Sequence, residues 1–222
     1  MASHIPDDLY THLHRTGVIA VLMIDEAHDA VPVAKALLAG GVDCMELTLR
    51  TPAAMEALRR IRNEVPQMIA GVGTILTPQQ ARDVKAAGAH FGVSPGINSH
   101  VVAEAIQLGL PFAPGICTPS DIEQALEQDC QLLKFFPAEP CGGLDYLKAI
   151  AAPYALLGVR YIPLGGIDEN NAVKYLRSPH IHAIGGSWLA PKFMIEARDW
   201  DGITTNAKRA SSMAARAREG LS

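Results

Sequence analysis

A single lysine lies inside an otherwise apolar stretch of this sequence. Residues 131–139 read QLLKFFPAE, and no acidic residue stands within four positions of Lys134 on either side. Consecutive Leu and Phe residues are typical of a strand that is buried on both faces of a parallel sheet. Burial can lower the pKa of a lysine, and a neutral amine can attack a carbonyl carbon to form a Schiff base. The alternative is a lysine that extends from the strand end into water.

Polar residues also alternate along a second strand-like segment. Glu46, Thr48 and Arg50 are spaced by two, so in a strand they project from one face, with Val42 and Cys44 below them. The row offers a carboxylate for proton transfer and a guanidinium that can grip a carboxylate through two hydrogen bonds. An internal Glu46–Arg50 ion pair that only stabilises the fold is the alternative.

The elements that must position these residues follow a regular rhythm. Apolar strand segments are predicted at 18–22, 42–49, 68–73, 90–94, 111–114, 131–136, 159–164 and 181–186. Helices are predicted at 26–38, 52–64, 78–87, 98–108, 119–128, 143–152, 168–177 and 200–218. This alternation implies an α/β fold with a parallel sheet, and eight units imply a closed (β/α)8 TIM barrel. An open doubly wound sheet is the alternative, but no Gly-x-Gly-x-x-Gly turn follows the first strand.

Short signals predict where the helices begin and end. Thr-Pro pairs at 51–52, 77–78 and 118–119 each predict an N-cap followed by proline in the first turn, and Asp168-Glu169 predicts a similar start. Glycines at 40–41, 88 and 109 precede strands and predict helix ends, with a left-handed cap at 40–41. The repetition of these signals supports a repeating βα unit.

The chain is predicted to be one domain, residues 1–222, because no linker-like run rich in Pro, Gly or Ser divides it. Residues 1–16 contain an amphipathic N-terminal helix, predicted at 5–16, that could cap the bottom of the barrel. Residues 17–222 would form the barrel itself.

In such a barrel the functional side chains converge at the carboxyl ends of the strands. By strand alternation, Ala70, Val72 and Thr74 are predicted to share the inward face of the third strand. Ser94-Pro95-Gly96 predicts a rigid loop after the fourth strand, and Phe136 is two residues beyond Lys134.

Two glycine pairs end the last two predicted strands. They are Gly165-Gly166 and Gly185-Gly186, and Ser187 follows the second pair. Barrels often bind phosphate with the loops after strands seven and eight, where backbone N–H groups approach the anion. Tight turns also favour glycine, so either pair alone is weak evidence. Both pairs at these two places predict an anion site.

Composition narrows the possible partners and compartment. The chain is 222 residues long, 49% hydrophobic, with a formal net charge of −4. Its sequence contains no stretch in which Lys and Arg cluster with aromatic residues, so nucleic-acid binding is not expected. Four cysteines without a Cys-x-x-Cys pair, and histidines without a His-x-x-x-His pair, predict reduced thiols and no metal site. No apolar run is long enough to span a membrane and the N-terminus is polar, so a cytoplasmic protein without a membrane partner is expected.

Six motifs in order resemble the 2-keto-3-deoxy-6-phosphogluconate (KDPG) aldolases, a family that includes the 4-hydroxy-2-oxoglutarate (KHG) aldolases. The motifs are ELTLR at 46–50, GVGT at 71–74, SPG at 94–96, KFFPAE at 134–139, LGGI at 164–167 and IGGSW at 184–188. The resemblance covers about residues 17–208. It implies a class I, metal-free aldolase of carbohydrate metabolism (the Entner-Doudoroff type) on a (β/α)8 barrel, usually a homotrimer. Its small-molecule substrate would be KDPG or a related 2-keto acid, cleaved to pyruvate and an aldehyde such as glyceraldehyde 3-phosphate or glyoxylate.

The resemblance also implies roles for individual residues. Lys134 matches the family's Schiff-base lysine, and Glu46 matches its general acid/base. Arg50 and Thr74 match the binders of the pyruvate carboxylate. The remaining substrate-binding residues are expected to be Pro95, Phe136, Leu164, Gly165, Gly166, Gly186 and Ser187. No cofactor is expected beyond the covalent lysine imine. Leu164 departs from the pattern, because threonine is common there in the KDPG branch, and this position bears on stereochemical preference.

Two other function classes stay open. One is a phosphosugar isomerase or epimerase on the same barrel, with Glu46 as base and Lys134 acting only through its charge. The other is a non-catalytic protein that binds a phosphorylated metabolite.

Overall fold

Strands and helices alternate along the chain in the computed structural model, which describes residues 4–219. Residues 1–3 of the predicted N-terminal segment and residues 220–222 lie outside the described part. The strands are β1 (Val18–Leu22), β2 (Cys44–Thr48), β3 (Ile69–Gly73), β4 (Gly92–Val93), β5 (Phe112–Ala113), β6 (Gly115–Ile116), β7 (Leu132–Phe135), β8 (Arg160–Pro163) and β9 (Ile184–Gly186). The α-helices are α1 (Asp7–Thr16), α2 (Ala30–Ala39), α3 (Ala54–Glu64), α4 (Pro78–Ala86), α5 (Ser99–Gln107), α6 (Pro119–Leu126), α7 (Gly143–Ala151), α8 (Ala172–Leu176), α9 (Lys192–Glu196) and α10 (Trp200–Glu219). Two 3-10 helices, η1 (Ala27–Asp29) and η2 (Ala152–Leu157), precede α2 and follow α7.

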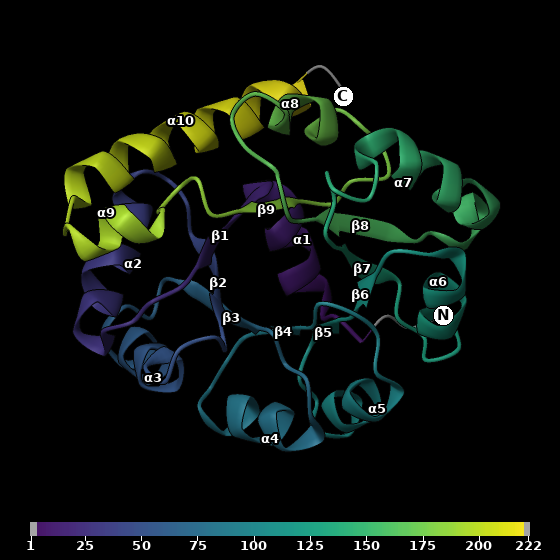
Figure 1. Cartoon of the computed structure of the whole chain (residues 1–222), viewed down its shortest axis with the longest axis horizontal. Coiled ribbons are helices and arrows are strands. Elements are labelled where there is room, and N and C mark those ends of the chain that lie inside the picture. Colours follow the sequence, from purple (N-terminus) through teal and green to yellow (C-terminus); the bar gives the residue numbers. More distant parts are fainter. Residues whose placement is uncertain (1–3, 220–222) are drawn as a thin grey trace.

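The strands form a closed parallel barrel. One sheet has the order β5-β4-β3-β2-β1-β9 and the other β6-β7-β8. Only Pro114 separates β5 from β6, so these two short strands are pieces of one barrel strand. A parallel bridge between Tyr161 and Ile181 joins the β8 side to the β9 side. Figure 1 shows the strands as a ring with the helices outside it. The predicted (β/α)8 barrel is therefore confirmed.

The N-terminal helix closes the lower end of this barrel. Leu9 and Leu13 of α1 are buried in a cluster with inward-facing side chains of the strands, among them Cys44, Phe91 and Leu132. In Figure 1 this helix lies behind the ring of strands. The predicted capping helix is confirmed, and its buried leucines close this end of the barrel.

Two of the three predicted Thr-Pro helix starts are confirmed. The Thr77 and Thr118 side chains each accept a hydrogen bond from a backbone N–H three residues on, and both form capping boxes. The start predicted at Thr51-Pro52 is wrong, because α3 begins at Ala54 without a side-chain cap. The Thr51 hydroxyl instead donates to the carbonyl of Ile24, which ties the loop after β2 to the loop after β1.

The signals predicted at Asp168 and at Gly40-Gly41 are confirmed only in part. Asp168 accepts hydrogen bonds from the N–H groups of residues 170 and 171, but α8 begins only at Ala172. At the predicted cap 40–41, Gly40 is right-handed with φ −87° and only Gly41 is left-handed, with φ 82°.

The alternation predicted for the third strand is wrong by one residue. Ala70 and Val72 pack in the outer core between strands and helices. Val42, predicted below Glu46 on the inward face of the second strand, packs in this outer core as well. The residues that pair with Glu46 and Thr48 across the ladder are Gly71 and Gly73. Side chains paired in this register project to the same side of a parallel sheet, so β3 presents glycines to the barrel interior.

No helix within residues 4–219 is long and apolar enough to cross a membrane.

Candidate active site

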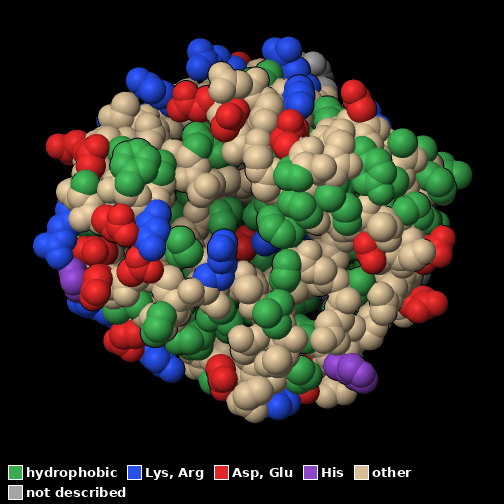
Figure 2. Space-filling view, in the orientation of Figure 1, with side chains coloured by type: hydrophobic (Ala, Val, Ile, Leu, Met, Phe, Trp, Pro, Cys, Tyr) green, Lys and Arg blue, Asp and Glu red, His purple; other side chains and the backbone are tan. Residues whose placement is uncertain are grey.

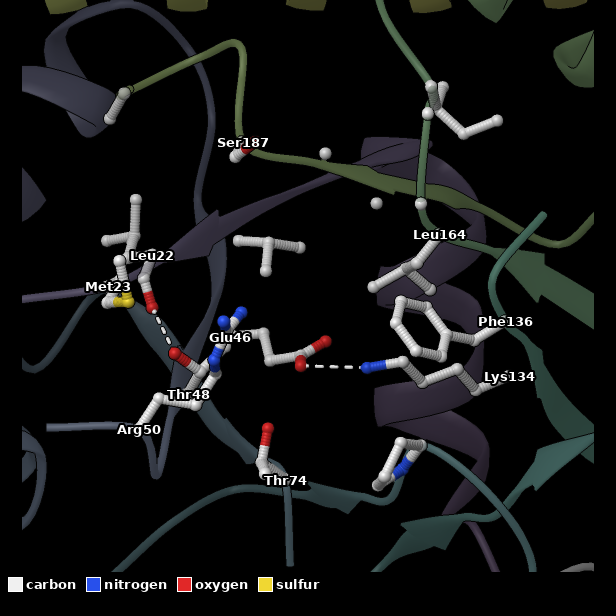
Figure 3. A pocket seen from close by; sticks show the side chains of 18 of the residues that line it. Leu22, Met23, Glu46, Thr48, Arg50, Thr74, Lys134, Phe136, Leu164 and Ser187 are labelled. Carbon is white, nitrogen blue, oxygen red and sulfur yellow. Dashed lines mark hydrogen bonds and ion pairs between the residues drawn. The ribbon is translucent and has the colours of Figure 1, made fainter. Parts of the chain in front are cut away.

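Lys134 and Glu46 meet inside the barrel. The ammonium of Lys134 on β7 donates a hydrogen bond of 2.9 Å to Oε1 of Glu46 on β2. The two side chains are only 7% and 3% exposed, so the lysine does not extend into bulk water. The Glu46 carboxylate is paired with Lys134, and no Glu46–Arg50 ion pair is present between these described residues. Figure 3 shows the two side chains pointing toward one another from opposite sides of the cavity.

Small neighbours make room for this pair. A Cβ atom on Gly73 would lie 1.8 Å from Oε1 of Glu46, so only glycine at this place on β3 leaves the carboxylate where it is. The ring of Phe136 has its centroid 5.4 Å from the Lys134 nitrogen, close enough for a cation–π contact. Thr48 is occupied elsewhere, because its hydroxyl donates to the carbonyl of Leu22 at 3.1 Å.

A cavity of about 350 Å³ opens above the pair. The sequence-predicted site residues all line it: Glu46, Arg50, Thr74, Pro95, Lys134, Phe136, Leu164, Gly165, Gly166, Gly186 and Ser187. In Figure 2 the molecule is hollowed near the centre of this face, with basic and hydrophobic side chains at the edge of the hollow. Residues from at least six strand ends or loops thus converge on one space.

Arg50 and Thr74 stand on one side of the cavity (Figure 3). Within residues 4–219 the Arg50 guanidinium has no hydrogen bond or ion pair, which leaves its fork of N–H donors available to an anionic ligand. Thr74 has φ 63°, a left-handed conformation that is rare for a β-branched residue. Such a conformation costs on the order of 1–3 kcal/mol and is found mainly at functional sites.

Glycine turns form another part of the wall. Gly165 and Gly166 have φ 95° and 81°, and their carbonyls accept hydrogen bonds from Glu139 N–H at 3.0 Å and from the Asn171 amide at 2.8 Å. Gly186 lies beneath Trp188, whose ring would be 1.7 Å from a Cβ at that position. The turns are therefore fixed in place and expose bare backbone to the cavity.

Several lining residues were not predicted as ligand contacts from the sequence. They are Val21, Leu22, Met23, Thr48, Ile167, Gly185, Ala190, Pro191 and Lys192. Lys192 is the chemically important one, since it adds a second amine to the cavity. Its ammonium is 2.6 Å from Asp25, and this hydrogen bond raises the pKa of Lys192, so the group stays protonated. Lys192 begins α9, the short helix after the second glycine pair, but no signal in the sequence singles out this side chain as one that reaches the cavity.

Within residues 4–219, no group of three or more His, Cys, Asp or Glu side chains is arranged to hold a metal ion.

The family model for KDPG and KHG aldolases matches residues 9–206. The chain belongs to the KDPG and KHG aldolase family. The resemblance carried by the six sequence motifs is thereby confirmed, and the match spans the whole barrel with most of its capping helix and the first turns of α10.

Relatives and solved structures in this family align over most of the chain. A 2-dehydro-3-deoxy-phosphogluconate aldolase of Treponema pallidum is 45% identical over 196 residues, covering 88% of this chain and 92% of the relative. A KDPG aldolase of Legionella pneumophila, solved with pyruvate captured as a covalent carbinolamine, has a TM-score of 0.86 at 37% identity. It covers 90% of this chain, and this chain covers 97% of it.

A third member of the KDPG and KHG aldolase family, from Zymomonas mobilis, was solved with 3-phosphoglycerate. It has a TM-score of 0.86 at 38% identity, with 92% of this chain and 95% of that chain covered. The closed barrel found here is thus shared with solved KDPG aldolases, and the alternative of an open doubly wound sheet is wrong.

Proposed function

We propose that this chain is an aldehyde-lyase, a class I aldolase that cleaves KDPG or a related 2-keto-3-deoxy or 4-hydroxy-2-keto acid through an imine on Lys134. The products are pyruvate and an aldehyde, such as glyceraldehyde 3-phosphate or glyoxylate. The observation that carries the proposal is the buried Lys134 amine, 2.9 Å from the Glu46 carboxylate at the base of the cavity. Family membership and the covalent carbinolamine in the Legionella pneumophila relative support it.

In the proposed reaction Glu46 first takes a proton from the ammonium of Lys134, and the amine attacks the keto carbon C2. Glu46 then protonates the departing hydroxyl, and loss of water gives a protonated imine. A carboxylate within hydrogen-bond distance of the amine is placed for both transfers. The imine accepts the electron pair of the C3–C4 bond as that bond breaks, while Glu46 receives the C4 hydroxyl proton. Protonation of the enamine at C3 and hydrolysis return pyruvate and the free lysine.

The protonated imine nitrogen supplies the electron sink in this sequence, so we propose that the reaction needs neither a metal nor another cofactor. Closing the cavity floor with α1 keeps bulk water away from the imine and strengthens the charge interactions around it.

The rest of the cavity is proposed to hold the two ends of the substrate. Arg50, with an unpaired guanidinium among the described residues, would bind the α-carboxylate, assisted by Thr74. At the other end, the glycine turns at 165–166 and 186 with Ser187 would bind the distal phosphate through backbone N–H groups and a hydroxyl. Pro95, Phe136 and Leu164 would form the apolar walls between them.

Trapping with pyruvate and borohydride tests the imine. We expect one reduced pyruvate on the peptide that contains Lys134, and no label on Lys134→Arg, because a guanidinium stays protonated and cannot form the imine. Lys148→Arg, a change at an exposed lysine of α7, is the matched control and should label like the wild type. A label that persists in Lys134→Arg, at Lys192 or Lys148, would contradict the assignment.

The two alternative functions give different outcomes in a product assay. An isomerase or epimerase that uses Lys134 only as a charge would convert a phosphosugar without a trapped adduct, and a binding protein would turn nothing over. Pyruvate release from a panel of 2-keto-3-deoxy acids, with and without a phosphate group, identifies the preferred substrate.

We further infer that residues 1–222 form one domain, that the protein is cytoplasmic, and that it assembles as a homotrimer. The single barrel supports the first inference, and the free cysteines support the second. Large apolar side chains on the surface, among them Leu156 at 100% and Phe193 at 68% exposure, are consistent with contacts between copies. Light scattering coupled to size-exclusion chromatography should give three times the chain mass of 23.7 kDa.

A further inference from the structure

Two thiols meet beside the strand that carries Lys134. Cys117 follows β6 and Cys141 lies in the turn before α7, and their sulfur atoms are 2.9 Å apart. Both cysteines are free and half-buried, so small reagents in the solvent can reach them. The other two cysteines, Cys44 and Cys130, are buried. The pair is outside the cavity lining, and the proposed reaction does not use it.

Hydrogen bonds hold both backbones at this meeting point. The N–H of Cys117 donates to Asp121 at 2.9 Å, and its carbonyl accepts from the Tyr146 hydroxyl at 2.8 Å. The N–H of Cys141 donates to the carbonyl of Pro137 at 3.1 Å. A disulfide needs the sulfurs about 2.05 Å apart, so from 2.9 Å they must approach by about 0.9 Å, a movement within reach of two side-chain rotations.

We propose that Cys117 and Cys141 form a redox site, a reversible disulfide made on exposure to a peroxide. The Cys141 thiolate attacks one oxygen of hydrogen peroxide, breaking the O–O bond and giving a sulfenic acid and, after protonation, water. The Cys117 sulfur then attacks the sulfenic sulfur and displaces a second water. Two thiols and one peroxide thus become one disulfide and two waters. A small dithiol reverses the step by thiol–disulfide exchange.

The order of attack follows from the surroundings of the two thiols. Burial, together with the hydrogen bond to Cys141, raises the pKa of Cys117 to about 11, so this thiol is the poorer first nucleophile. The Cys117 S–H also donates to the Cys141 sulfur at 2.9 Å, so Cys141 meets the peroxide first and Cys117 resolves the sulfenic acid. This order is the arrangement typical of redox-sensing cysteine pairs.

The disulfide would clamp the segment that presents Lys134. It closes a loop from residue 117 to residue 141 that contains α6 and β7. The end of this loop also supports the substrate-side turn, since Ala138 N–H donates to Leu164 and Glu139 N–H donates to Gly165. Closing a loop of this length restricts the unfolded chain more than the folded one, so oxidation should raise the Tm by about 5–10 °C.

The test uses the intact wild-type protein, treated with hydrogen peroxide and then with dithiothreitol. Intact mass spectrometry should show the loss of two hydrogens, a non-reducing peptide map should join the Cys117 and Cys141 peptides, and dithiothreitol should reverse both. The Tm should rise on oxidation and return on reduction. Cys117→Ser and Cys141→Ser are matched variants that should keep the reduced Tm of the wild type but show no rise.

Three results would overturn the proposal. They are sulfinic or sulfonic acid without a cross-link, a cross-link that involves Cys44 or Cys130 or a second chain, and a Tm rise that persists in either serine variant. These three readouts are independent of aldolase activity, so a failure here is distinct from a failure of the proposed function.

Discussion

At the scale of single residues, the buried Lys134–Glu46 pair makes each charge dependent on the other. Removing one partner of a buried ion pair leaves the other uncompensated, which costs several kcal/mol, so truncation would confuse stability with catalysis. An isosteric amide keeps the volume and a hydrogen-bonding oxygen but loses the ability to carry a proton. Glu46→Gln is therefore the informative change at this 2.9 Å contact.

We expect Glu46→Gln to bind pyruvate and form some imine, but to exchange the methyl protons of pyruvate about 10²–10⁴-fold more slowly, the range for lost acid/base catalysis. Proton NMR in deuterated buffer measures the exchange. Glu56→Gln, a change at an exposed glutamate of α3, should exchange like the wild type. Unchanged exchange in Glu46→Gln would mean that another group moves the proton.

Leu164 is buried between the cavity and the next strand. Its side chain lies against Gly185, where a Cβ would be 2.6 Å from it, and it also lines the cavity near Phe136 (Figure 3). Leu164 therefore contacts the neighbouring strand and also borders the cavity. An apolar side chain offers the substrate no hydrogen bond, and apolar pockets discriminate weakly between substrates that differ in a hydroxyl.

Introducing Leu164→Thr should sharpen the preference between the C4 epimers, the gluconate- and galactonate-derived substrates. The threonine hydroxyl can bond a substrate oxygen on one face of the aldehyde. The measurement is kcat/KM for both epimers in the wild type and the variant. A ratio that changes by less than about a factor of two would remove the support for this reading of Leu164.

At the scale of elements, the ladder between β2 and β3 sets the depth of the site. Glu46 pairs with Gly71 and Thr48 with Gly73, so two glycines face the polar side chains of β2. The ring of Phe91 fills the place beside Gly71, and the Glu46 carboxylate fills the place beside Gly73. The glycines of β3 thus leave the space that the Glu46 carboxylate of β2 occupies.

Gly73→Ala should displace Glu46, because the added methyl would lie 1.8 Å from Oε1. We expect slower methyl-proton exchange, by a factor approaching that of Glu46→Gln, with the fold retained by circular dichroism. Gly96→Ala is the control, since a Cβ at Gly96 meets nothing within 4 Å. Equal exchange rates in the two variants would show that Glu46 relocates without loss.

At the scale of the whole molecule, α1 is fastened to the barrel around His182. The His182 ring donates from Nε2 to the carbonyl of Tyr10 at 2.8 Å, and its centroid lies 3.9 Å from that of the Tyr10 ring, with the two planes tilted by 37°. The pKa of His182 is lowered to about 4, chiefly by burial; the hydrogen bond to Tyr10 opposes this shift, and the positive charges of Arg218 and Arg160 add to it. Burial lowers the pKa of His14 as well, and its ring is 5.0 Å from that of His182.

These shifts make the docking of α1 sensitive to acid. Unfolded His182 has a pKa of about 6.5, so between about pH 6.5 and pH 4 the unfolded chain binds a proton that the folded chain does not. The contribution of neutral His182 to the free energy of unfolding is therefore fully present above pH 6.5. It is lost as the pH drops through this window. A pKa difference of this size corresponds to roughly 3 kcal/mol.

His182→Gln should flatten this pH dependence, because glutamine can donate to Tyr10 but does not titrate. Urea unfolding at pH 7 and pH 4.5, followed by tryptophan fluorescence, measures the loss in each protein. We expect the loss in the variant to be smaller than in the wild type by about 2 kcal/mol. His100→Gln, at an exposed histidine of α5, should keep the wild-type loss. Equal losses in His182→Gln and the wild type would assign the acid sensitivity to other groups.

Local sequence patterns were enough to predict the fold and about half of the cavity lining. Strand periodicity, helix caps and glycine turns are local signals, and a barrel repeats the same local unit eight times, so few long-range choices remain. The alternation of Glu46, Thr48 and Arg50 placed their side chains correctly, because every second residue of a strand shares a face. Sequence motifs predicted the roles of the site residues, and the experiments above test those roles.

Three kinds of feature depend on how the elements pack together. The inward face of β3 depends on its register with β2, and sequence periodicity does not distinguish Gly71 and Gly73 from Ala70 and Val72 as the interior set. Thr74 reaches the cavity through a left-handed backbone that no local signal predicts. Lys192 beside the cavity, and Cys117 beside Cys141, are contacts between segments far apart in the chain. The physical reason is common to all three: local sequence specifies an element and its faces, but packing against other elements selects the register and the neighbours.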